Sequence, residues 1–86
     1  MMIYQVFFGF KNAQGRPVYW TIEHPAPTIE ALGAELGERG FIIAARLWTE
    51  SDGSGSRKIT ARDSVIIGLT DLGAIQVAGV KHWEQG

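Results

Sequence analysis

The stretch that decides the fold is residues 2–23, MIYQVFFGF-KNAQG-RPVYWTIE, in which two apolar runs flank a short polar segment. In the first run Tyr4 and Val6 alternate with Gln5 and Phe7, and a period of two residues is typical of a β-strand. Residues 16–23 alternate in the same way. The polar residues 11–15 end in Gly15, which suits a tight connection. Together these features predict an antiparallel β-hairpin.

A helix is expected after this hairpin. Residues 24–27, HPAP, end the second strand because proline cannot donate a ladder hydrogen bond. Thr28 is a natural N-cap and Gly40 a natural left-handed residue after the last turn, so the helix is predicted between them. Gly33 and Gly37 lie four residues apart on it. Either one helix face approaches a neighbouring element closely, or two glycines are tolerated on a short helix.

The second half of the chain favours further strands. Residues 41–50 alternate, and we expect Leu47 to face the helix while Arg46 and Trp48 face away from it. Residues 51–56, SDGSGS, predict a flexible hairpin loop, and residues 57–61 a polar strand at the sheet edge. Residues 65–69 and 74–80 predict two more strands.

Two stretches near the end of the chain need separate mention. A short helix across residues 63–72 is the alternative to a strand there, but β-branched residues and Gly68 favour the strand. Residues 81–86 are expected to form a C-terminal tail.

The predicted order is β-β-α-β-β-β-β, within a single domain spanning residues 1–86. Consecutive strands with one helix, rather than alternating strands and helices, indicate an α+β fold. We therefore expect an antiparallel sheet of about five or six strands with one helix packed on one face.

Composition narrows the function classes. Eight basic and nine acidic residues give a formal net charge of −1, so no overall field steers the chain toward nucleic acid or an anionic membrane. There is no cysteine, which excludes disulfides, thiolate nucleophiles and cysteine-based metal sites and favours a reducing cytoplasm. Neither a signal peptide nor an apolar run of about 18 residues is visible. A bacterial or phage cytoplasm, including mobile elements, is the default expectation.

No familiar catalytic arrangement can be assembled from the sequence. His24 and His82 are the only histidines and have no paired spacing, so no metal site is predicted. The Gly/Ser-rich loop lacks the Lys-Ser/Thr ending of a phosphate-binding loop, and no cofactor is expected. The carboxylates available for acid–base chemistry lie at predicted turns or strand ends: Glu50, Asp52, Asp63 and Asp71. An enzyme with an unrecognised histidine or carboxylate site is kept as an alternative.

The strongest functional indication is the sheet face expected to point away from the helix. If Tyr4, Trp20 and Leu47 turn inward, the outward residues include Phe7, Tyr19, Arg46 and Trp48. Aromatic residues and arginine are enriched at protein–protein interfaces. We therefore predict a protein-interaction domain, an adaptor or inhibitor that also self-associates. The competing interpretation is that these rings stabilise the sheet as cross-strand pairs, or are covered by the chain's own end.

A second hypothesis is binding of single-stranded nucleic acid by Arg57, Lys58 and Arg62. Bases would stack on Tyr19 or Trp48 while the cations hold phosphates. Acidic residues around the same hairpin oppose this interpretation, and cations on an edge strand also protect it against aggregation.

Overall fold

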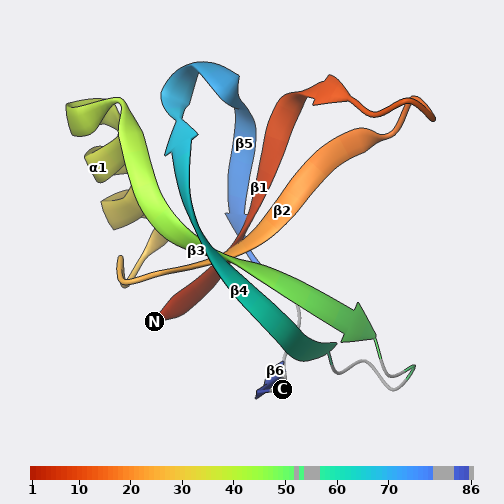
Figure 1. Ribbon diagram of the computed structural model, residues 1–86. Helices are drawn as coiled ribbons and strands as arrows, with labels where there is room; N and C mark the ends of the chain where they lie inside the picture. The colour runs from red at the N-terminus through yellow and green to blue at the C-terminus, as the bar shows by residue number, and fades with distance from the viewer. Residues whose placement is uncertain (52, 54–56, 79–82, 86) are drawn as a thin grey trace.

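The computed structural model describes residues 1–51, 53, 57–78 and 83–85, which form one helix and one sheet (Figure 1). The elements are β1 (Met2–Lys11), β2 (Pro17–His24), α1 (Ile29–Arg39), β3 (Phe41–Ser51), β4 (Arg57–Gly68), the 3-10 turn η1 (Leu69–Asp71), β5 (Leu72–Val77) and β6 (Trp83–Gln85). The strand order is β5-β1-β2-β3-β4-β6. Neighbours from β5 to β4 are antiparallel, whereas β6 runs parallel to β4. The expected α+β fold is confirmed.

The last strands differ from the prediction in their bounds. The predicted strands at 57–61 and 65–69 are one continuous strand, β4, because its polar middle stays in register with β3 through the pairs Arg46–Asp63 and Leu47–Arg62. The alternative helix over 63–72 is wrong apart from η1. The strand predicted at 74–80 corresponds to β5, which spans Leu72–Val77, and residues 79 and 80 lie outside the described residues.

Two other predicted segments fall partly on residues that are not described. Residues 52 and 54–56 of the predicted loop lie outside the described residues, and Gly53 has a positive φ of 84°. Residues 81, 82 and 86 of the predicted tail also lie outside them, while Trp83–Gln85 form β6 beside Arg57–Ile59.

The turn between β1 and β2 is built around one asparagine. The Oδ1 of Asn12 accepts hydrogen bonds from the amides of Gln14 and Arg16, both at 3.0 Å. Gly15 has a φ of 77°, a left-handed conformation that glycine adopts without steric cost. The polar segment recognised in the sequence therefore closes the hairpin through one side chain and one glycine.

Helix α1 has the predicted ends. The Thr28 hydroxyl accepts a hydrogen bond from the Ala31 amide at 3.1 Å, and Gly40 ends the helix with a φ of 79°. A Cβ added at Gly33 or Gly37 would meet nothing within 4 Å. The prediction that a neighbouring element approaches the helix closely at these glycines is therefore wrong, and the two glycines are simply tolerated. Within the described ranges, no helix is long and apolar enough to cross a membrane.

The main core lies between α1 and one face of the sheet, here called the helix face. Its buried residues come from α1, from the segment before it and from four strands: Tyr4, Val6, Ile22, Ala26, Leu32, Leu36, Ile42, Ala44 and Ile67. The Tyr4 hydroxyl donates to the Ala26 carbonyl at 2.7 Å. His24 is also buried; its Nδ1 accepts from the Ala26 amide, and its Nε2 donates to Glu35 Oε2, both at 2.9 Å.

The orientation predicted for β3 is wrong by one residue. Ile22 pairs in register with Arg46, and paired residues of antiparallel strands share a face, so Arg46 lies on the helix face. Ile42 and Ala44 are buried there, while Phe41 and Ile43 are exposed on the opposite side, here called the far face. Alternation alone could not settle this orientation, because Leu47 is buried on the far face and β3 is therefore apolar on both sides.

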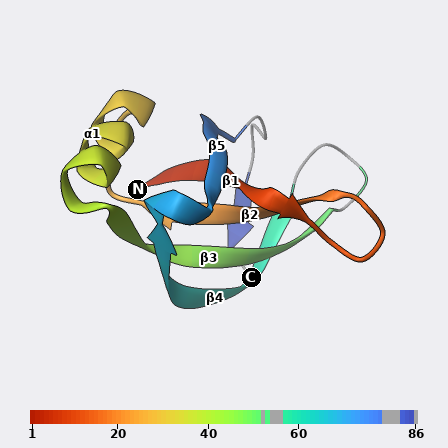
Figure 2. The same ribbon diagram turned by 90° about the horizontal axis from the view of Figure 1, so that it is seen from above.

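Strands β5 and β6 form the two edges of the sheet, and both of its faces carry buried residues. Figure 2 shows the strands in succession from β5 and β1 through β2 and β3 to β4, with α1 at one end. Part of the far face is buried as well, at Thr21, Leu47 and Ile59.

Candidate interaction surface

The candidate site lies where the two long hairpins separate. Strands β2 and β3 pair only through Thr21–Glu23 and Ala45–Leu47, and beyond these residues the β1–β2 and β3–β4 hairpins diverge (Figure 1). Arg46 lies at the root of this fork. Its guanidinium is 4.4 Å from the ring centroid of Trp20 and 3.8 Å from that of Trp48, within the range of cation–π contacts.

A carboxylate completes this stack. The Nε1 of Trp48 donates a hydrogen bond to Asp63 Oδ2 at 2.7 Å, and Asp63 pairs with Arg46 across β3 and β4. Burial lowers the pKa of Arg46, while the negative charge of Asp63 raises it. Because the ordinary pKa of arginine is so high, the guanidinium remains charged at neutral pH. Two indoles, one cation and one anion thus hold each other in place.

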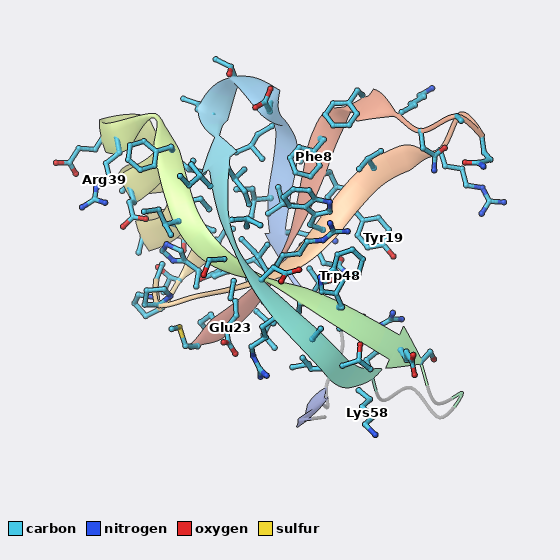
Figure 3. All side chains as sticks on the ribbon, in the orientation of Figure 1. Phe8, Tyr19, Glu23, Arg39, Trp48 and Lys58 are labelled. Atoms are coloured by element: carbon cyan, nitrogen blue, oxygen red, sulfur yellow. The ribbon has the colours of Figure 1, made fainter. Side chains whose placement is uncertain are left out.

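The stack continues along β1 as a row of aromatic rings. Phe8 meets Trp20 edge-on at 4.9 Å, and Phe8 stacks on Phe10 at 5.4 Å. Phe10 is 55% exposed and Trp48 is 43% exposed. Figure 3 labels Phe8 and Trp48 on the two hairpins of the fork. We call this set the aromatic ridge: Phe8, Phe10, Trp20, Arg46 and Trp48.

The ridge is open because α1 is short compared with the strands beneath it. The 11 residues of α1 span about 16 Å, whereas the 10 residues of β1 span about 33 Å. The helix therefore covers only one end of the helix face. Trp20 and Phe8 belong to the apolar set predicted to face inward, and in the structure they are partly buried and pack against the core.

The four predicted site residues do not form one surface. Arg46 and Trp48 lie on the helix face, whereas Phe7 and Tyr19 pair with each other on the far face, with ring centroids 5.6 Å apart. Tyr19 is 51% exposed there. The prediction failed because the orientation of β3 was reversed. The ridge members missed by it are Phe8, Phe10 and Trp20, and their anchoring partner Asp63 was also missed.

The predicted nucleic-acid residues are divided as well. Arg57 lies on the far face and donates to Thr49 Oγ1 through Nε at 3.0 Å and Nη2 at 2.9 Å. Arg62 lies on the same face, with its Nε 3.8 Å from Glu23 Oε1. Lys58 is exposed and pairs in register with Glu50, on the side of the sheet that carries Trp48.

Among the described residues, no group of three or more histidine, aspartate or glutamate side chains gathers, and no pocket opens. Both ring nitrogens of His24 are engaged, and His82 and Asp52 lie outside the described residues.

Neither family models, nor curated proteins, nor solved structures match this chain. Its function therefore has to be inferred from the surface itself. The feature that distinguishes this surface is a fixed Trp–Arg–Trp stack beside two phenylalanines.

Proposed function

We propose that this chain is a small non-enzymatic protein-interaction domain, an adaptor or inhibitor that binds its protein partner through the aromatic ridge. The observation that carries the proposal is the stack of Trp20, Arg46 and Trp48. Tryptophan and arginine are among the residues that contribute most at protein interfaces. Here Trp48 is exposed although its only polar atom is already bonded to Asp63, so the outer ring surface is free for apolar contact.

Preorganisation supports the same proposal. Immobilising a rotamer-rich side chain during association costs about 0.5–1.5 kcal/mol. Arg46 and Trp48 are already held by contacts at 3.8 Å and 2.7 Å, so much of this cost is met when the chain folds. A partner therefore meets a rigid cluster of rings.

The shape and charge of the ridge favour a protein over other ligands. Small molecules bind in concave sites, and the ridge is open. Nucleic-acid binding requires several cations directed at phosphates, but Arg46 is balanced by Asp63, and the predicted cations lie on both faces of the sheet. We place the domain in a reducing cytoplasm, because it has no cysteine.

Comparative capture from lysate of the native host tests the proposal. The bait is the tagged full chain, and the variants are Phe10→Ala and Trp48→Ala. The matched control is Tyr19→Ala, an equally exposed aromatic residue on the far face. We expect a partner that binds the wild type and the control, with affinity reduced at least about tenfold in the ridge variants when purified partner is titrated.

The result against the proposal is binding that survives both ridge substitutions. Loss of binding in Tyr19→Ala alone would place the site on the far face. A separate titration with single-stranded oligonucleotides at low salt distinguishes the nucleic-acid hypothesis, because salt-reversible quenching of tryptophan fluorescence would support it.

A further inference from the structure

A second apolar surface lies on the far face, away from the aromatic ridge. Ile43 and Ile66 are opposite each other in register, and Phe41 lies two residues from Ile43 on the same face of β3. Ile66 is 70% exposed, Ile43 is more than half exposed, and Phe41 is also exposed. We call these three residues the isoleucine patch.

The chain covers only one part of its far face. Further along the same two strands, Leu47 and Ile59 are almost completely buried on this face. Toward the other end of β3 and β4 the face is equally apolar at the isoleucine patch but lies open. Three such side chains expose roughly 300 Å² of apolar surface, comparable with the largest patches on typical monomers, which are often functional.

The patch lies between a carboxylate in η1 at one end and an ion pair between β4 and β2 at the other. A Cβ placed on Gly68, which pairs with Phe41, would lie 3.5 Å from Asp71 Oδ2, so this carboxylate borders one end. At the other end Ser64 leads to Arg62, which lies on the same face and contacts Glu23 at 3.8 Å. No charged residue occurs from 64 to 70.

We propose that the isoleucine patch is the contact surface for a second copy of this chain, related by a two-fold axis through the patch. Antiparallel placement of the two β4 strands brings Asp71 of each copy toward Arg62 of the other, where Arg62 can bridge Asp71 and its own Glu23. A parallel placement would bring the two Asp71 carboxylates together. The net charge of −1 gives little repulsion between copies. This surface is separate from the ridge, so the inference goes beyond the proposed function.

Sedimentation velocity of the full chain over a wide concentration range tests this inference. Wild type should show a reversible monomer–dimer equilibrium. Ile66→Lys places two cations near the axis and should weaken the dimer at least about 30-fold. Ile43→Lys is a second variant expected to act in the same direction. The matched control is Val77→Lys, a half-exposed apolar residue on β5 at the opposite edge of the sheet, which should leave the dimer unchanged.

Circular dichroism melts confirm that each variant folds, as expected for substitutions of exposed side chains. A wild type that stays monomeric at every concentration overturns the inference. So does a dimer that survives both isoleucine variants, or one that Val77→Lys weakens equally. Phe10→Ala should leave the dimer intact and Ile66→Lys should leave partner capture intact, so failure of this inference is distinguishable from failure of the proposed function.

Discussion

Alanine substitution at two adjacent positions of β3 distinguishes the two orientations of this strand. Ile42 is 1% exposed and belongs to the core beneath α1, whereas Ile43 is 57% exposed on the far face. Truncating a buried isoleucine removes its transfer free energy and leaves a cavity, which costs about 2–5 kcal/mol. Ile43→Ala makes the same chemical change in an open environment, and its cost should be about 1 kcal/mol or less.

Urea unfolding followed by far-UV circular dichroism and tryptophan fluorescence measures both free energies. For a domain of this size 1 kcal/mol corresponds to about 4–8 °C in Tm, so Ile42→Ala should lower Tm by at least about 8 °C. The m-values should stay unchanged, which shows that stability rather than compactness was altered. If Ile43→Ala costs as much as Ile42→Ala, or more, the orientation of β3 is wrong and the aromatic ridge does not exist as described.

Two further predictions concern the core and the helix. Burial, with a smaller contribution from Glu30, raises the pKa of Tyr4, so its neutral form stabilises the fold and that stability should be lost as pH rises above about 10. Tyr4→Phe should remove this alkaline loss and cost about 1–2 kcal/mol at neutral pH through the lost bond to Ala26, as absorbance titration and urea unfolding will show. Gly40→Ala should destabilise the fold by about 1–2 kcal/mol, because residue 40 has a left-handed backbone conformation. Gly37→Ala should stabilise the fold by about 0.5–1 kcal/mol, because alanine favours a helix more than glycine does and an added Cβ meets nothing there. Equal effects of the two substitutions in thermal melts would contradict the position of the helix end.

The sequence was informative where local chemistry decides the structure. Asn12 and Gly15 close the first hairpin, Thr28 begins the helix and Gly40 ends it. Each of these residues lies within a few residues of the groups it contacts. Such features are readable because one side chain and its near neighbours determine them. The α+β class followed from the order of these elements.

The orientation of β3 and the continuity of β4 depend on contacts between distant residues. Arg46 looked like a surface residue but is held by Trp20, which lies on another strand. Arg62 and Asp63 resembled a break between two strands, yet one contacts Glu23 and the other bonds Trp48, so the strand continues through them. A polar segment inside a strand is tolerated when each charge has a partner across the sheet.

Site-specific photo-crosslinking tests the central claim most directly. A benzophenone-bearing phenylalanine is placed at position 10 on the aromatic ridge, at position 48 within it, or at position 19 on the far face, and the chain is irradiated in cells of its native host. These three side chains are similarly exposed, so accessibility alone does not distinguish them. The ridge positions should yield the same crosslinked protein and position 19 should not. Crosslinking to that protein from position 19 alone, or from none of the three, would contradict a binding role for the ridge.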